Sequence, residues 1–332
     1  MAWDGVRAAR ALHEATLFRR ANVVGLALGH KVTRGRETDE ACVVVYVERK
    51  VSEGALARRD IVPKALEGVR TDVVETGRFR AFMLMQRPDP PRTSRVRPAP
   101  GGVSLAHVRV TAGTLGALVR RRDGTTAILS NNHILANSND ARLGDLIVQP
   151  GPADGGTEAD GIARLADFVP IAFADRGAGV LARMLERMFG PLLGRLGLGL
   201  KRLPSGRTNL VDAAVATPLG ADLVTPDILE IGRVRGPVDA DIGMRVRKSG
   251  RTTGLTAGRI TGIDGVVQVD YDGKSAVFRQ QVVSDLLSRG GDSGSLVVDE
   301  SNRAVGLLFA GSDVTTLVNP IGAVLHLLEI EF

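Results

Sequence analysis

Three residues that lie far apart in the sequence have the side chains needed to activate a hydroxyl group. His133 follows a short polar run at residues 130–132, Asp212 lies in an apolar stretch, and Ser293 lies in a glycine-rich turn. An imidazole can take the proton of a serine hydroxyl, and a carboxylate can hold that imidazole in the required tautomer. The order His, Asp, Ser therefore predicts nucleophilic acyl transfer with Ser293 as the nucleophile.

The turn around Ser293 is the strongest of the three signals. Gly291-Asp292-Ser293-Gly294 runs directly into the apolar residues 296–298, a pattern that presents a side chain at the end of a strand. The main-chain amides of Gly291 and Ser293 are the predicted donors to the oxyanion. Because Gly-Asp-Ser-Gly also occurs in ordinary hairpin turns, the assignment depends on His133 and Asp212 as well.

His133 and Asp212 each have a structural alternative. A single histidine is more often bonded within a core or loop, and Asp212 could bond main-chain amides at a strand end. An ionised carboxylate within the apolar residues 209–216 is unfavourable, however, unless a donor such as an imidazole N–H meets it.

Other enzyme classes lack their required residues. His13-Glu14 is not followed by the second histidine of a zinc-binding helix, and Gly273-Lys274-Ser275 lacks the earlier glycine of a phosphate loop. A nucleophile elbow would need glycine where Ser295 stands. The sequence therefore predicts no metal and no organic cofactor.

Composition predicts a globular protein of the cytoplasm. Of the 332 residues, 44% are hydrophobic, and Cys42 is the only cysteine, so the chain forms no internal disulfide. Residues 1–20 mix charged and apolar positions and contain no export signal, and no segment reads as membrane-spanning.

The net charge of +6 arises from 43 basic and 37 acidic residues, and only 4% of residues are aromatic. Such a mixed surface with few stacking rings predicts no nucleic-acid partner. Basic residues near 180–203 leave an anion-binding surface as a weaker alternative.

Hydrophobic patterning divides the chain into three parts. Residues 1–87 read as a small α+β domain, with a helix over 1–20 and a hairpin formed by 23–28 and 42–47. Prolines make residues 88–102 an extended linker, and short β-rich runs over 103–332 predict antiparallel barrels. Helical spacing over about 174–203 predicts an inserted helical segment.

Residues 103–332 resemble the trypsin-like serine peptidases of chymotrypsin fold, in the PA clan. Residues 130–136 look like the family's histidine motif, 212–215 like its aspartate strand, and 291–294 like its nucleophile loop. Residues 249–254 resemble a hairpin of bacterial members. The N-terminal domain and residues 144–156 look like bacterial relatives of the plant Narrow Leaf trypsin-like proteins.

The resemblance implies a mostly β fold with two antiparallel six-stranded barrels and a cleft between them. It further implies a serine endopeptidase that acts on proteins or peptides, in which the strand Phe309-Ala310-Gly311 pairs with an extended substrate. Leu287 would form the floor of the specificity pocket, which favours an apolar or small side chain before the scissile bond.

Two positions depart from the family pattern. Ser295 replaces a glycine, and Phe309 takes a position often held by a small hydroxyl residue. With no activation site before Gly101, Lys248 or Arg247 is expected to pair with Asp292.

One alternative is a catalytically idle barrel that binds peptides. The N-terminal domain is expected to regulate the cleft or, like the helical insertion, to support a homo-oligomer.

Overall fold

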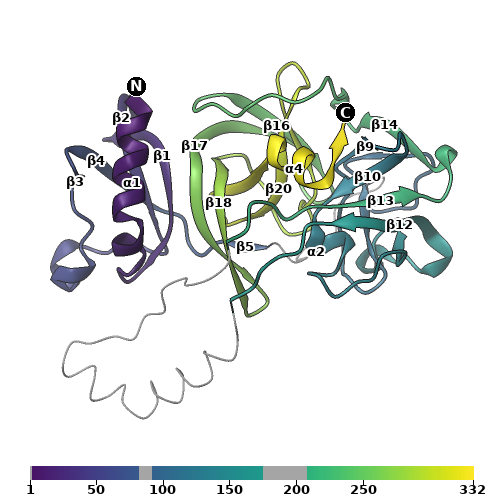
Figure 1. Cartoon of the computed structure of the whole chain (residues 1–332), viewed down its shortest axis with the longest axis horizontal. Helices are drawn as coiled ribbons and strands as arrows, with labels where there is room; N and C mark the ends of the chain where they lie inside the picture. Colours follow the sequence, from purple (N-terminus) through teal and green to yellow (C-terminus); the bar gives the residue numbers. More distant parts are fainter. Residues whose placement is uncertain (1, 82–91, 175–207) are drawn as a thin grey trace, which may run out of the picture.

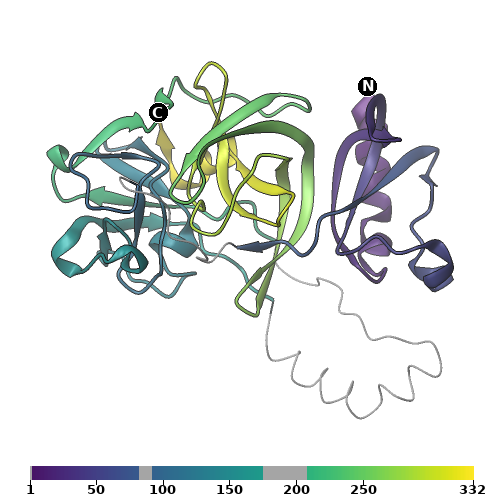
Figure 2. The same ribbon diagram turned by 180° about the vertical axis from the view of Figure 1, so that it is seen from behind.

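Two antiparallel β-barrels and a smaller α+β unit make up the described part of the chain (Figure 1). The structure, a computed structural model, describes residues 2–81, 92–174 and 208–332. The second barrel lies between the α+β unit and the first barrel in the views from both sides (Figures 1 and 2). The mostly β, two-barrel architecture expected from the sequence is confirmed. The expected helical insertion falls on residues 175–207, outside the described part.

The N-terminal unit packs one helix on a small sheet. Its elements are α1 (Ala2–Phe18), β1 (Val23–Thr33), β2 (Arg36–Val47), the 3-10 turns Glu53–Ala55 and Arg58–Asp60, β3 (Ala65–Leu66) and β4 (Val69–Glu75). The predicted hairpin is confirmed, because β1 pairs antiparallel with β2. Its turn uses Arg34 and Gly35, both at positive φ, as tight hairpin turns require. One face of β1 and β2, with side chains such as Leu26 and Val45, is buried against α1, and the other face packs with the second barrel.

The first barrel follows an eight-stranded path in the order β22-β9-β10-β13-β12-β11-β7-β8. Its strands are β7 (Ser104–His107), β8 (Gly113–Thr114), β9 (Ala117–Arg121), β10 (Thr126–Ser130), β11 (Leu146–Val148), β12 (Gly161–Phe168), β13 (Ala214–Pro218) and β22 (Ile330–Glu331). The short helix α2 (Asn132–Leu135) follows β10, and the core is filled by aliphatic side chains such as Leu105 and Ile128.

A three-stranded sheet flanks this barrel in the order β15-β14-β6. It consists of β6 (Ala99–Gly101), β14 (Val224–Ile228) and β15 (Gly232–Arg233); the nearby 3-10 turns are Pro152–Asp154, Glu158–Asp160 and Ala221–Leu223. Although β6 comes from the proline-rich segment, it is an edge strand, where a proline such as Pro100 is tolerated.

The second barrel is closed. Its six strands run in the order β16-β19-β20-β21-β18-β17, and β16 pairs with β17 to complete the ring. They are β16 (Arg245–Gly250), β17 (Gly254–Tyr271), β18 (Lys274–Ser284), β19 (Leu296–Asp299), β20 (Ala304–Gly311) and β21 (Thr316–Pro320). Helix α4 (Ile321–Leu328) then leads to β22, which pairs with β9, so the end of the chain connects the two barrels.

The N-terminal unit is continuous with the second barrel. Strand β1 pairs antiparallel with β17, with Leu26 opposite Val266, so the two sheets form one eleven-stranded sheet. Arg279 on β18 also forms two hydrogen bonds to the Glu14 carboxylate on α1, at 2.9 and 2.5 Å. A short strand, β5 (Arg80–Ala81), leaves the unit and pairs with β17 and β20.

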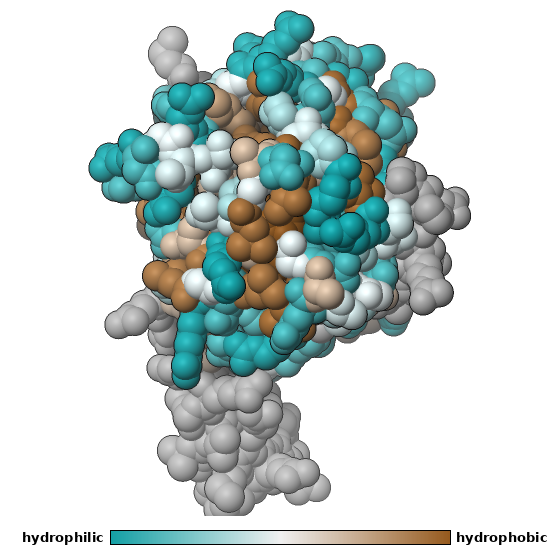
Figure 3. Space-filling model, turned by 90° about the vertical axis from the view of Figure 1, so that its right-hand side faces the viewer, coloured by the Kyte–Doolittle hydropathy of each residue, from teal (hydrophilic) through white to brown (hydrophobic). Residues whose placement is uncertain are grey.

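The surface is mixed in polarity. The face at the first-barrel end carries apolar positions among hydrophilic ones (Figure 3). Within the described ranges, no helix is both long and apolar enough to cross a membrane.

The seam between β1 and β17 predicts that the N-terminal unit and the second barrel share one core. Leu26→Ala should lower the free energy of unfolding by about 2–5 kcal/mol, because the side chain is fully buried at that seam. Urea denaturation measures this loss, and Leu12→Ala, at a 67% exposed position of α1, is the control. Equal stability of the two variants would contradict the shared core.

Candidate active site

His133 lies in a short helix that directly follows a strand, as the sequence predicts. Strand β10 ends at Ser130, and His133 lies in α2 with its side chain only 9% exposed. The neighbouring Asn131 donates from its side-chain amide to the main-chain oxygen of Asp212 at 2.7 Å. The imidazole packs edge-on against the ring of Tyr271, with 5.8 Å between the centroids.

The Asp212 carboxylate is fully buried and is met by three donors. The two side chains are joined by a 2.6 Å hydrogen bond between His133 Nδ1 and Asp212 Oδ2, and the His133 amide donates to Oδ1 at 3.1 Å. The Tyr271 hydroxyl donates to Oδ2 at 2.8 Å. Three donors stabilise an ionised carboxylate that burial alone would disfavour. Asp212 lies two residues before β13 rather than within a strand.

The second ring nitrogen of His133, Nε2, is the one available to accept a proton. When Nδ1 donates to Asp212, Nε2 is left unprotonated and can accept a proton. Among the described residues, Nε2 is buried and has no hydrogen-bond partner. This arrangement is the one a general base requires.

Tyr271 is a site residue that the sequence analysis missed. It ends the long strand β17 of the second barrel, whereas Asp212 belongs to the first barrel. Burial and the neighbouring Asp212 carboxylate raise the pKa of Tyr271 well above its usual value, so the phenol stays protonated and can donate. No local signal in the sequence marks Tyr271 as a partner of Asp212, because the contact depends on which distant segments come together.

The serine turn has the backbone that its glycines predict. Gly291 and Gly294 have φ values of 97° and 93°, and a Cβ at Gly294 would lie 2.1 Å from Ser130 Oγ. Ser293 is fully buried, and its hydroxyl donates to the main-chain oxygen of Phe309 at 3.3 Å. The hydroxyl is thus turned toward β20, and among the described residues no hydrogen bond joins it to His133.

The two predicted oxyanion donors are unengaged. Among the described residues, the amides of Gly291 and Ser293 donate to no other group of the chain. The adjoining carbonyls are held instead: Gly290 accepts from Thr252 Oγ1 and Gly291 from Thr114 Oγ1, each at 2.7 Å. The loop therefore has fixed carbonyls and two free N–H groups for a developing negative charge.

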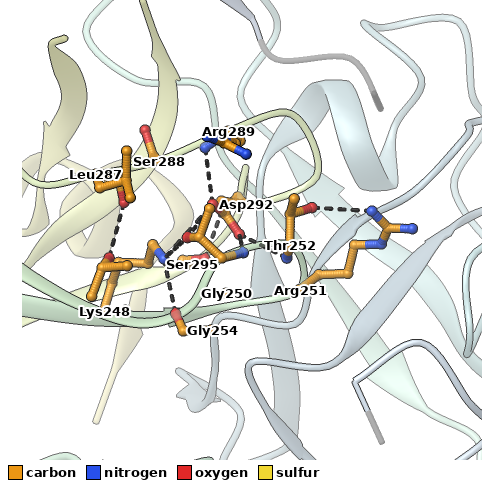
Figure 4. Close-up of polar contacts among 12 residues, drawn as sticks. Lys248, Gly250, Arg251, Thr252, Gly254, Leu287, Ser288, Arg289, Asp292 and Ser295 are labelled. Atoms are coloured by element: carbon orange, nitrogen blue, oxygen red, sulfur yellow. Dashed lines mark hydrogen bonds and ion pairs between the residues drawn. The ribbon is translucent and has the colours of Figure 1, made fainter. Parts of the chain in front are cut away.

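Asp292 anchors this loop to the tip of the β16–β17 hairpin (Figure 4). Its carboxylate accepts hydrogen bonds from the amides of Thr252, Thr253 and Arg289 at 2.8–3.0 Å and from the Thr253 hydroxyl at 2.7 Å. Lys248 Nζ lies 3.7 Å away, and both side chains are fully buried.

Lys248 is therefore the cation beside Asp292. Arg247, the other expected partner, donates instead to Asn302. Burial lowers the pKa of Lys248 to about 8, although the Asp292 charge acts in the opposite direction. The lysine is charged below that pH and loses its proton above it.

Ser295 and Arg251 complete the support. Ser295 Oγ donates to the main-chain oxygen of Asp292 at 2.6 Å, so the residue that replaces a glycine closes the turn. Arg251, fully buried at the hairpin tip, donates from Nε to Asp154 of the first barrel at 2.9 Å. The hairpin tip thus touches both the nucleophile loop and the opposite barrel.

The expected specificity residues are only partly brought together. The last three residues of β20, Phe309, Ala310 and Gly311, are all buried. Leu287, which the resemblance places at the floor of the specificity pocket, is 48% exposed. The loop here turns the next residue inward: Ser288 is buried, and its hydroxyl bonds that of Thr316 at 2.6 Å.

A cleft of about 250 Å³ lies beside His133. Its lining includes Thr111, Tyr271 and Lys274, together with Ala81 from β5. Within the described ranges, no group of three or more histidine, cysteine or acidic side chains is placed to hold a metal ion.

Comparison with known proteins gives two kinds of likeness. A family model described as the NARROW LEAF 1 N-terminal domain matches residues 6–75. Protein NARROW LEAF 1 of rice (Oryza sativa subsp. japonica) is 25% identical over 335 residues, which cover 91% of this chain and 53% of the rice protein. The chain thus spans about half the length of this curated relative, and the expected likeness to Narrow Leaf proteins is confirmed.

Two similar solved structures are a protease and a chymotrypsin. Thermobifida fusca protease A is 19% identical with a TM-score of 0.45, covering 70% of this chain and 96% of that one. Cellulomonas bogoriensis chymotrypsin is 17% identical with a TM-score of 0.43, covering 70% and 97%.

The contact between Tyr271 and Asp212 predicts a kinetic effect. Tyr271→Phe should slow labelling of the chain by a fluorophosphonate probe about tenfold, because a hydrogen bond to a charged group contributes about 1.5–3 kcal/mol. The second-order rate constant of labelling measures this. Tyr46→Phe, at the chain's other tyrosine, is the control and should label like the wild type. If Tyr271→Phe were labelled as fast as Tyr46→Phe, Tyr271 would have no role at the site.

Titration of Lys248 predicts an alkaline limit to reactivity. Labelling should decline as pH rises through about 8, where Lys248 loses the charge that faces Asp292. Lys248→Met should label slowly at every pH without this decline, whereas Lys64→Met, at an exposed position, should keep it.

The contribution of Lys248 to folding stability should depend on pH in the opposite direction to labelling. The folded-state pKa of Lys248 is depressed, so between about pH 8 and the usual 10.5 the unfolded chain binds more protons, and this residue's contribution to stability rises with pH. A decline in labelling that coincided with unfolding would refute this account.

Proposed function

We propose that the chain is a serine endopeptidase, with Ser293 as nucleophile, His133 as general base and Asp212 as the carboxylate that orients it. The observation that carries the proposal is the hydrogen bonding of the two ring nitrogens of His133. Nδ1 is bonded to a buried carboxylate at 2.6 Å, and Nε2 is left without a partner among the described residues. A nucleophile turn with two unengaged amides completes the set.

The proposed reaction proceeds through an acyl-enzyme. Ser293 Oγ forms a bond to the carbonyl carbon of the substrate while its proton passes to His133 Nε2. The C–N bond then breaks, and the same proton goes to the leaving amine. Water repeats the sequence on the ester, and the amides of Gly291 and Ser293 stabilise the oxyanion in both halves.

The proposed preference before the scissile bond is an apolar or small side chain. Leu287 offers no carboxylate, and the buried hydroxyls of Ser288 and Thr316 bond each other. Neither feature provides the negative charge that would select lysine or arginine. The proposed substrates are proteins or peptides.

A second candidate function is peptide binding without catalysis. The observation that favours it is the Ser293 hydroxyl, which bonds the main-chain oxygen of Phe309 and not His133. A barrel that only binds extended chains needs no such proton transfer.

Covalent labelling separates the two functions. The wild-type chain should react with a fluorophosphonate, a probe that requires only an activated hydroxyl and the oxyanion donors. Ser293→Ala should abolish labelling, and peptide cleavage should fall by a factor on the order of 10⁶.

Ser301→Ala is the matched control for this experiment, because Ser301 is an exposed serine of the second barrel. It should label like the wild type. A folded wild-type chain that resists the probe would leave the binding function as the better account.

A further inference from the structure

The edge of β20 that should receive a substrate backbone is already paired. Strand β5 runs antiparallel to β20, with Ala81 opposite Ala310 and Arg80 opposite Gly311. These are two of the three residues expected to pair with an extended substrate. An extended segment of the same chain therefore makes the main-chain contacts that a bound peptide would make.

The position of β5 is set by an anchor immediately before it. Phe79 is only 1% exposed and packs edge-on against Tyr46 of the N-terminal sheet, with 5.9 Å between the ring centroids. Its main-chain oxygen accepts from the amide of Asp270 on β17 at 3.2 Å. Because β1 pairs with β17 in one sheet, the N-terminal unit holds this segment beside the cleft that Ala81 lines.

The occupied edge adjoins the candidate active site. Ala81 lines the same cleft as His133 and Tyr271. Ser293 is fully buried, and all eight residues of β20 are buried as well. A peptide backbone can pair with Ala310 and Gly311 only after β5 has left them.

We propose that β5 is an autoinhibitory strand that competes in cis with extended peptides for the edge of β20. The inference rests on the proposed function only in identifying this edge as the peptide-binding one. Release is local: the sheet shared by β1 and β17 keeps the N-terminal unit in place while the two residues of β5 detach.

The competition is expected to be modest in strength. Strand β5 has only two residues, and it contacts β20 through main-chain pairing. A site that is open for a fraction of the time binds its ligand more weakly by that fraction. We expect at least about a tenfold weakening, which corresponds to about 1.4 kcal/mol.

The test measures peptide binding in a chain that cannot react. In a Ser293→Ala background, a fluorescently labelled peptide with the sequence of residues 77–81 is titrated against three forms of the full chain. The first form has no further change. The second carries Arg80→Pro, because proline lacks the main-chain N–H and is excluded from a strand paired on both sides. The third carries Arg80→Ala, which removes the side chain and keeps the backbone.

Arg80→Pro should bind the peptide at least about tenfold more tightly than the other two forms, as measured by fluorescence anisotropy. Arg80→Ala should match the unchanged chain, because the competing contacts are those of the main chain. Equal affinity in all three forms would overturn the proposal. Equal gains in the proline and alanine variants would also overturn it, since they would assign the effect to the arginine side chain.

A second pair of changes decides the matter if the proline variant does not fold. Ala81 and Ala310 are direct partners across the strand pair, a separation that suits a disulfide. The double change Ala81→Cys and Ala310→Cys should cross-link on oxidation and then exclude the peptide completely. If the folded double variant did not cross-link, β5 would not occupy the edge of β20 and the proposal would be refuted.

The two proposals fail in different ways. Binding of the peptide does not depend on Ser293, so a chain that resists fluorophosphonate refutes catalysis and leaves this experiment intact. A chain that labels readily but binds the peptide equally in all forms refutes autoinhibition alone.

Discussion

The buried carboxylate of Asp212 is the constraint on which the candidate site depends. With no exposed surface, this group is stable in its ionised form only if donors surround it, and three do: two from His133 and one from Tyr271. Satisfying the carboxylate fixes the imidazole, and fixing the imidazole directs Nε2 away from Asp212. The same contacts bring the two barrels together, because Tyr271 belongs to the second barrel and His133 to the first.

Other contacts position the loop that carries Ser293. The hairpin tip of β16 and β17 reaches Asp154 through Arg251 and the loop through Thr252, so one short segment positions both sides of the cleft. Buried polar groups in such a network are costly unless all are bonded, and Asp292 meets that condition with four hydrogen bonds and a nearby lysine. In the proposed reaction, the reactivity of Ser293 therefore depends on the protonation of Lys248, which faces Asp292.

Local signals account for what the sequence could predict. The turn glycines around Ser293, the polar run before His133 and the lone carboxylate in an apolar stretch each mark a backbone feature, and the structure has these features. Tyr271, Leu287 and β5 depend instead on which distant strands come together. A tyrosine at a strand end carries no mark of its partner, and the exposed Leu287 precedes a residue, Ser288, that bonds Thr316 of a distant strand. The two residues of β5 are too few to give a periodic pattern.

The tautomer of His133 is the most direct measure of the central claim. Nitrogen NMR of the full chain labelled with ¹⁵N-histidine, with the signal of His133 identified by its loss in His133→Gln, reads the protonation of each ring nitrogen. We expect the neutral ring to carry its proton on Nδ1, and we expect that signal to change in Asp212→Asn. A proton found on Nε2 instead, or a signal indifferent to Asp212, would contradict it.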